Sequence, residues 1–520
     1  TAAYRLLQAG FDCRVFEARP VIGGRSLTLR HGDVLVERPP RPYVDDGRPS
    51  SEQRCVFQPS DAHGFDRPYL NAGPGRIPSA HTHVLDLCRE LGVPLEVYVM
   101  ESRSNLVRSG GRSLVNRHVA NDARGWIAQA LFERADSMPL SPARREALRG
   151  LLIQFGALGN GQTGQRGVYA LAGAYQRSDR AGYRELPGVE PGEPVSPLAL
   201  AEILDTRFWE RPFYQPEDFL WQPTLFQPVG GMDRIVHALA DAVGRGRVRT
   251  GVAATAIRRD GGRWRIALSD GTVQHADVCV SNVPLPLLRG PLGDLDAQPF
   301  DPTLRSALRT VFSLPPTGVD GFLAPTTKVG WQARRALWQQ PDPAAGRVVP
   351  IYGGISWTEH PMTQLWYPSD RVHDDLGVLT GAYNFRGDAT AWGERSPGWR
   401  LASARQGAAE LAGTAFAAGL GAGLAIAWQN VEHLRGGWAQ WQNVPNGVEV
   451  YGRLARGDQR SHFYFCGDQL SQLPGWQEGA VASALHTVAQ IAVAGYEMPA
   501  VDEVPDSRLM VEGMMPVEPE

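Results

Sequence analysis

The hydrophobic and polar positions at the start of the chain predict a helix followed by a short strand. In residues 1–10 the apolar side chains recur at the spacing of one helical face, and Gly10 stands where a helix end favours a left-handed residue. The apolar stretch 13–16 then predicts a strand that ends at Glu17. A helix and a strand in this order are typical of the second half of a βαβ nucleotide-binding unit.

The first half of such a unit is a strand with a glycine-rich GxGxxG turn, and it does not precede this helix in the sequence. A parallel sheet without its central strand would expose two unpaired edges. We therefore expect the natural chain to begin upstream of Thr1.

The next segments differ in pattern. Residues 33–68 are rich in proline, arginine and aspartate and predict loops, and Ser79 is placed to cap a helix that runs to Leu91. Residues 120–220 predict mainly helices. One of these begins at Ser141-Pro142, an N-cap residue followed by proline in the first helical position.

The second half of the chain alternates between strand and helix patterns. Residues 248–280 predict a β-meander, and residues 301–430 predict a mixture of strands and helices. The stretch 477–494 predicts a long amphipathic helix. From Val501 the chain is acidic and rich in proline, so we expect it to be disordered.

Composition narrows the classes of function. A chain of 520 residues exceeds one hydrophobic core, so two or three domains are expected. The net charge of −3 gives no sign of a nucleic-acid partner, and no apolar run is long enough to span a bilayer. The five cysteines are scattered without a CxxC pair, which argues against a disulfide framework or a zinc site. We expect a cytoplasmic protein with no metal, nucleic-acid or membrane partner.

A candidate nucleotide site lies near the start. Glu17, at the end of the predicted strand and before Ala18, can accept hydrogen bonds from both ribose hydroxyls of an adenosine. Gly23 and Gly24 let the backbone approach a pyrophosphate, which Arg25 can neutralise. Taken alone, a surface glutamate and an ordinary turn explain these residues equally well.

A second candidate site lies near the end of the chain. Asp468, which follows a predicted strand and Gly467, can bind a ribityl hydroxyl. The helix that begins at Gln477 would direct its N-terminal N–H groups at an anion such as a reduced flavin. A capped helix beside a buried Trp476 is the competing interpretation.

Together, the order and separation of these sites resemble the flavin amine oxidases, and within them the L-amino-acid oxidases. The matching segments run along nearly the whole chain: 16–20, 23–25, 72–78, 228–233, 328–329, 366–369, 467–468 and 475–480. Segment 73–78, Gly-Pro-Gly-Arg-Ile-Pro, and the following 85–92 are most similar to bacterial tryptophan and chlorotryptophan oxidases of secondary metabolism.

The resemblance implies an α/β fold with an FAD-binding Rossmann-like domain of the glutathione-reductase type, built from discontinuous segments. It also implies a substrate domain with a mixed sheet and a helical region. The expected boundaries are 1–70, 228–300 and 430–500 for the FAD-binding domain, 71–120 and 301–429 for the substrate domain, 121–227 for the helical region and 501–520 for a disordered tail.

The resemblance also implies catalytic roles. Arg76 would hold a substrate carboxylate with two parallel hydrogen bonds and so select amino acids over amines. Lys328 would hold a water at the flavin, and Trp476 would form an aromatic wall. Alternation along a strand lets either Trp366 or Tyr367 face the site, and we choose Tyr367 as the carboxylate partner or second wall. The competing interpretations are a salt-bridged arginine, a solvated lysine and aromatic residues that only pack in a core.

Other residues have binding roles by the same resemblance. Candidates for contact with the substrate side chain are Trp366, Gln227 and Leu225. The residues expected to bind FAD are Glu17, Ala18, Gly23, Gly24, Arg25, Gly73, Pro74, Gly75, Arg76, Ala254, Trp438, Gly467, Asp468, Gly475, Trp476, Gln477 and Ala480. Cys466 does not stand where the family's covalent flavin cysteine lies, so we expect noncovalent FAD. His81 and His83 are two residues apart, so we expect surface or capping residues and not metal ligands.

The implied reaction is oxidative deamination of an L-amino acid with an aromatic or large apolar side chain. Its products would be a 2-oxo acid by way of the imino acid, ammonia and, after reaction with O2, hydrogen peroxide. The alternatives are an amine oxidase, an amino-acid monooxygenase that releases CO2, and a flavin-free degenerate relative. A homodimer is expected from the resemblance alone.

Overall fold

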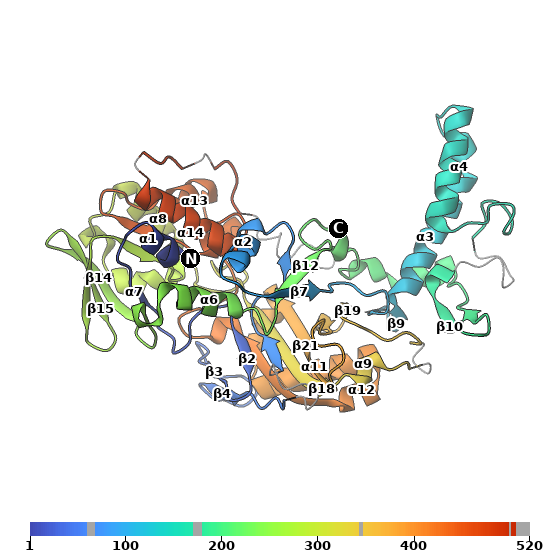
Figure 1. Ribbon diagram of the computed structural model, residues 1–520, viewed down its shortest axis with the longest axis horizontal. Coiled ribbons are helices and arrows are strands. Elements are labelled where there is room, and N and C mark those ends of the chain that lie inside the picture. The colour runs from blue at the N-terminus through green and yellow to red at the C-terminus, as the bar shows by residue number, and fades with distance from the viewer. Residues whose placement is uncertain (60–67, 170–178, 343–346, 494, 499–500, 506–520) are drawn as a thin grey trace.

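The computed structural model describes residues 1–59, 68–169, 179–342, 347–493, 495–498 and 501–505 of the chain. It combines helices with parallel, antiparallel and mixed sheets, so the expected α/β fold class is confirmed (Figure 1).

Segments from distant parts of the chain meet around the first helix. There α1 (Ala2–Gln8) packs against α6 (Arg234–Val243) and α14 (Gln477–Ala492). The parallel strand pairs of this region are β1 (Val15–Phe16) with β13 (Val248–Arg249) and β17 (Cys279–Ser281) with β23 (Phe463–Phe465). The two pairs form separate sheets. The predicted strand before Glu17 and the predicted helix from Gln477 are both confirmed.

Two further local predictions are confirmed. The meander consists of the antiparallel strands β14 (Ala254–Asp260), β15 (Arg263–Leu268) and β16 (Val273–Ala276). Helix α4 (Pro142–Gly156) begins as expected, because the Ser141 hydroxyl accepts a hydrogen bond from the backbone N–H of Arg144 at 3.4 Å.

Two other local predictions are wrong. Residues 33–68 contain the antiparallel strands β3 (Val34–Glu37) and β4 (Ser51–Arg54), whereas 60–67 lie outside the described residues. Burial alternates along β3, but the exposed positions are Val34 and Val36 and one buried position is Glu37, so the sequence shows no period-2 alternation of apolar and polar residues there. Ser79 does not cap a helix: α2 (Thr82–Glu90) begins three residues later.

A sheet of seven strands forms the core of the expected substrate domain. Its order is β22 (Leu420–Ala427), β18 (Thr326–Arg334), β21 (Leu376–Phe385), β20 (Gln364–Trp366), β19 (Ile355–Thr358), β8 (Leu106–Ser109) and β9 (Arg112–Val115). Helices α10 (Arg386–Gly393), α11 (Pro397–Ala412) and α12 (Thr414–Ala418) belong to the same region, and α11 packs on β22 and β21 (Figure 1). All but the last residue of β18 are buried, so this strand runs through the middle of the molecule.

The segment 121–227 is only partly helical. Helices α3 (Asn116–Glu133) and α4 project together as an arm in Figure 1, and α5 (Leu200–Thr206) packs on α3. The same segment also contains the pair β10 (Tyr183–Glu185) and β11 (Glu193–Pro194). It ends in β12 (Leu225–Pro228), which lies between β6 (Ile77–Pro78) and β7 (Leu95–Tyr98).

The remaining helices and strands complete the framework. They are β2 (Thr28–Arg30), β5 (Tyr69–Asn71), α7 (Arg289–Leu292), α8 (Pro302–Ser313), α9 (Ala336–Gln339) and α13 (Gly447–Ala455). Within the tail that we expect to be disordered, Val501 and Val504 instead pack against the hydrophobic core, and residues 506–520 lie outside the described part. None of the described helices is long and apolar enough to cross a membrane.

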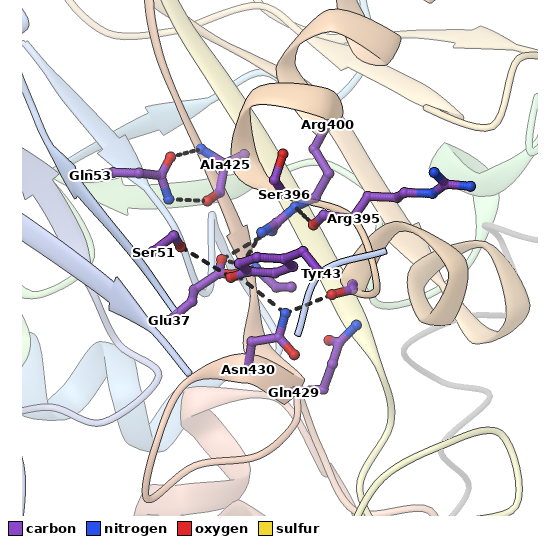
Figure 2. Close-up of polar contacts among 12 residues, drawn as sticks. Glu37, Tyr43, Ser51, Gln53, Arg395, Ser396, Arg400, Ala425, Gln429 and Asn430 are labelled. Carbon is purple, nitrogen blue, oxygen red and sulfur yellow. Dashed lines mark hydrogen bonds and ion pairs between the residues drawn. The ribbon is translucent and has the colours of Figure 1, made fainter. Parts of the chain in front are cut away.

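A buried polar cluster ties β3 to the large sheet (Figure 2). Glu37 and Arg400 form an ion pair with side chains that are both 0% exposed, and two parallel hydrogen bonds of 3.0 and 2.6 Å join them. The Tyr43 hydroxyl donates to the same carboxylate at 2.8 Å, and the backbone N–H of Ala427 donates to it at 2.8 Å. The carboxylate therefore has a donor for each of its oxygens, which a buried charge requires.

Candidate active site

The expected catalytic residues meet, with one exception, around a cavity between the seven-stranded sheet and the N-terminus of α14. Its lining includes Arg25, Gly73, Pro74, Gly75, Arg76, Lys328, Trp366, Trp438, Gly475 and Trp476, all singled out in the sequence. Residues from both ends of the chain thus share one cavity.

Lys328 lies on β18 with its side chain in this cavity and only 1% exposed. Its ammonium group donates hydrogen bonds to the carbonyl oxygens of Gly73 at 2.5 Å and Asn71 at 3.3 Å. It also lies 4.4 Å from the ring centre of Tyr383 and 4.9 Å from that of Trp366. Burial, together with the nearby charge of Arg76, lowers the pKa of Lys328 from 10.5 to about 7.

We expect the substitution Lys328→Met to stabilise the protein at neutral pH while it impairs turnover. A lysine with a pKa of about 7 in the folded state and near 10.5 in the unfolded state carries a folding cost that is fully present below pH 7. That cost falls as the pH rises toward 10.5. Urea unfolding should therefore show a gain of about 4 kcal/mol at pH 7 and about 2 kcal/mol at pH 9. A gain that does not shrink with pH would contradict the buried charge as its source.

Arg76 lies just C-terminal to Gly75 in the same wall and is 5% exposed. Its guanidinium carbon lies 3.8 Å from the ring centre of Trp221, 4.9 Å from that of Trp366 and 5.9 Å from that of Tyr98. Its Nε atom is buried without a hydrogen-bond partner, and no carboxylate among the described residues forms an ion pair with it. Burial lowers the pKa of Arg76 to about 10, so the group remains a cation at neutral pH.

Aromatic rings form the remaining walls. Trp366, Tyr383, Trp438 and Trp476 line the cavity, and Trp428 donates its indole N–H to the carbonyl oxygen of Ala72 at 3.0 Å. Tyr367 does not line it, so the choice of Tyr367 over Trp366 is wrong as to position. Its hydroxyl accepts a hydrogen bond from Ser356 at 3.2 Å inside another core cluster. Every residue of β20 is buried, so burial does not distinguish the two faces of the strand.

Several residues expected at the flavin are linked to one another at the cavity. Arg25 forms an ion pair with Asp468 and donates to the carbonyl oxygen of Gly437. The other oxygen of Asp468 accepts from the backbone N–H of Gly475 at 2.8 Å. Gly467 has a φ of +113°, and a Cβ atom there would lie 2.2 Å from the Asn282 side chain, so glycine is required.

The N-terminus of α14 offers donors to an anion at this place. No described residue accepts a hydrogen bond from the backbone N–H groups of Gln477, Glu478 or Gly479. The Gln477 side chain donates to the Ser26 hydroxyl at 2.9 Å, and Ala480 lies in the first turn of the helix. A cationic Arg25 together with free helix N–H groups suits the anionic part of a flavin nucleotide. The residues present at this end therefore fit such a group.

The residues expected at the adenosine and, with Gly23 and Gly24, at the pyrophosphate do not line the cavity but lie close to one another. The Glu17 carboxylate accepts from the backbone N–H of Arg19 at 2.8 Å, beyond Ala18, and burial raises the pKa of Glu17. Its carbonyl oxygen accepts from Val252 at 3.0 Å, two residues before Ala254. Gly23 and Gly24 both have positive φ values, and the carbonyl oxygen of Gly24 accepts from Arg19 at 3.0 Å.

Leu225 and Gln227 do not line the cavity. Leu225 is packed in the core cluster behind its wall, and the Gln227 side chain donates to Glu96 at 2.9 Å. Sequence reasoning also missed Trp221, Tyr383 and Trp428 as lining residues. Tyr383 lies opposite Lys328 in the register of β21 with β18, which no local pattern reveals.

The two histidines of the 81–83 segment have different environments. His81 is only 2% exposed, so it is not a surface residue, and burial lowers its pKa to about 4. Its ring packs edge-on against Trp476, with centres 4.8 Å apart. His83 bonds the Glu478 carboxylate at 2.6 Å, and the same carboxylate accepts from the backbone N–H groups of His83 and Val84. Glu478 of α14 therefore caps α2 in place of the expected Ser79. Within the described residues, no cluster of His, Cys, Asp and Glu has the arrangement of a metal site.

Comparisons with known proteins show the family and the fold of the chain. The sequence model of the flavin-containing amine oxidoreductases matches residues 1–166 and 205–492. A protein of Bacillus subtilis strain 168 named "Putative L-amino-acid oxidase YobN" is 20% identical over 94% of this chain and 91% of its own length. A double mutant of putrescine oxidase and the cyclohexylamine oxidase of Brevibacterium oxydans IH-35A each share the fold at a TM-score of 0.54 and 16% identity. These two alignments cover 94% of this chain and 95% of those chains. The chain thus belongs to the flavin-containing amine oxidoreductase family.

Proposed function

We propose that this flavin-dependent oxidoreductase is an L-amino-acid oxidase with noncovalently bound FAD. The observation that carries the proposal is Arg76, a buried cation that lines the cavity without a carboxylate partner among the described residues. An unpaired buried charge is costly, so it is retained where a ligand supplies the opposite charge. The α-carboxylate of an amino acid would do so, whereas a simple amine has no group for Arg76.

The site residues divide into two ends. Arg25, Asp468, Gly475 and the N-terminus of α14 would hold the flavin, which supplies two-electron oxidation of the substrate C–N bond when bound. None of the lining residues is a cysteine, and burial raises the pKa of Cys466 to about 11, so this thiol is protonated at neutral pH. Both observations support noncovalent binding.

At the substrate end, the side chains orient the substrate and exclude water. Arg76 would bind the carboxylate in the plane of its guanidinium group. Trp366, Tyr383 and Trp476 would confine the rest of the molecule, and such a wall favours an aromatic or large apolar side chain. Lys328, which is buried and has a pKa of about 7, can hold or release a proton in the same space. The name of the Bacillus subtilis relative agrees with this proposal.

An anaerobic visible spectrum tests the proposal on the purified protein. L-Tryptophan and tryptamine differ only in the carboxylate, so they form a matched pair. We expect the flavin absorbance near its visible maximum to bleach with L-tryptophan and not with tryptamine. Bleaching by tryptamine alone would instead indicate an amine oxidase, as the names of the putrescine and cyclohexylamine oxidases describe.

The products of aerobic turnover separate an oxidase from a monooxygenase. An oxidase yields one 2-oxo acid and one hydrogen peroxide per O2 consumed, whereas a decarboxylating monooxygenase yields an amide and CO2. We expect the 2-oxo acid. Formation of the amide would overturn the oxidase proposal and leave the role of Arg76 in carboxylate binding intact.

A further inference from the structure

Trp221 is a cavity residue that none of the expected roles includes. It is 3% exposed and lines the cavity, although it comes from the segment between α5 and β12. The guanidinium carbon of Arg76 lies closer to its ring centre, at 3.8 Å, than to any other aromatic ring. At this distance the cation stacks on the face of the indole.

Stacking leaves the donors of a guanidinium free. The two faces of the group pack on aromatic rings, while its N–H donors point outward in its own plane. An indole face therefore stabilises the cation without occupying the donors that a carboxylate needs. A protein carboxylate beside Arg76 would stabilise the charge too, but it would compete with the substrate. The position of the Trp221 ring thereby constrains where the Arg76 guanidinium can meet a carboxylate.

Trp221 also contacts the opposite wall. Its ring centre lies 5.2 Å from that of Trp476 at an interplanar angle of 55°, and Trp476 immediately precedes α14. Trp476 in turn packs edge-on against His81. Arg76, Trp221 and Trp476 thus form one continuous series of side-chain contacts in the wall of the cavity.

The surroundings of Trp221 keep it in place. Its backbone N–H donates to the carbonyl oxygen of Asp218 at 2.8 Å, which closes a turn. Its side chain belongs to a core cluster that also contains Phe208, Phe213 and Leu225. A ring fixed in this way can hold a flexible arginine side chain in one orientation, which lowers the entropy lost on binding.

We infer that Trp221 is a positioning residue that orients Arg76 for the substrate carboxylate and so contributes to the preference for amino acids over amines. The inference rests on the proposed function. It assigns to the 218–224 segment a part in substrate selection, separate from the residues that hold the flavin.

The experiment compares the variants Trp221→Leu and Trp221→Phe with the wild type, each with its flavin. Leucine keeps an apolar side chain but removes the aromatic face, and phenylalanine keeps a smaller face. Trp209→Leu is the matched control, since Trp209 belongs to the same region, is 39% exposed and does not line the cavity. Calorimetry measures binding of indole-3-propionate and of its neutral amide, neither of which can be deaminated. Kinetics with L-tryptophan and tryptamine give KM and kcat separately.

We expect Trp221→Leu to weaken binding of the acid about tenfold while it changes binding of the amide much less. The KM for L-tryptophan should rise more than kcat falls, phenylalanine should restore part of the loss, and Trp209→Leu should match the wild type. An equal loss for acid and amide would overturn the inference, because Trp221 would then be only a wall. An unchanged preference for the acid over the amide in both Trp221 variants would overturn the inference about Trp221 but not the proposed function. A wild type that binds the acid no better than the amide would overturn the proposed function as well.

Discussion

Replacing Arg76 with methionine is expected to lower kcat/KM for an L-amino acid about a thousandfold, and that for the matching amine less than tenfold. The variant would leave the substrate carboxylate in a mostly apolar cavity without its charge partner, and a buried unpaired charge costs several kcal/mol. The amine makes no such contact. Steady-state kinetics with L-tryptophan and tryptamine measure both values.

The thermal stability of the Arg76→Met variant provides a second test of the role of Arg76. Arg76 has no ion-pair partner among the described residues, so its removal leaves no protein charge unpaired and eliminates the cost of burying a cation. The melting temperature should therefore not fall. Arg76→Lys keeps the charge without the two-pronged geometry and should be intermediate. Arg54→Met, at an exposed arginine of β4, is the control. Equal losses for amino acid and amine would contradict selective carboxylate binding.

Replacing Glu37 with alanine is expected to lower the free energy of unfolding by about 3–5 kcal/mol. The variant leaves the fully buried Arg400 guanidinium without its counter-charge and the Ala427 N–H without its carboxylate acceptor, and it removes one of the two hydrogen-bond partners of the Tyr43 hydroxyl (Figure 2). Urea unfolding, followed by circular dichroism, measures the change.

The double variant Glu37→Leu with Arg400→Met tests the cause. If the loss comes from an unpaired buried charge, removal of both partners should recover most of the stability. Glu432→Ala is the control, because Glu432 forms an ion pair with Arg38 in which both side chains are largely exposed. It should change the free energy of unfolding by less than about 1 kcal/mol. A double variant as unstable as Glu37→Ala would show that lost packing, and not an unpaired charge, causes the loss of stability.

The sequence alone determined the features that depend on neighbouring residues. The proline after Ser141 starts helix α4, and short turns connect the strands of the meander. Both effects involve residues only a few positions apart, so they depend little on the surrounding structure. The residues that meet at the cavity were also named correctly in large part: Arg25, Arg76, Lys328 and Trp476 all line it. The order of these motifs along the chain resembles that of one family, and the members of a family share the fold that brings such motifs together.

Tertiary structure alone decided the features that depend on distant partners. Glu478 caps α2 from 395 positions away, so no local pattern could have excluded Ser79. Tyr383 reaches Lys328 through strand register, and Trp366 faces the cavity on a strand whose residues are all buried. Trp221 comes from a loop whose position depends on the core that surrounds it. In each case the contact links residues far apart in sequence, and only the packed chain brings them within a few ångströms.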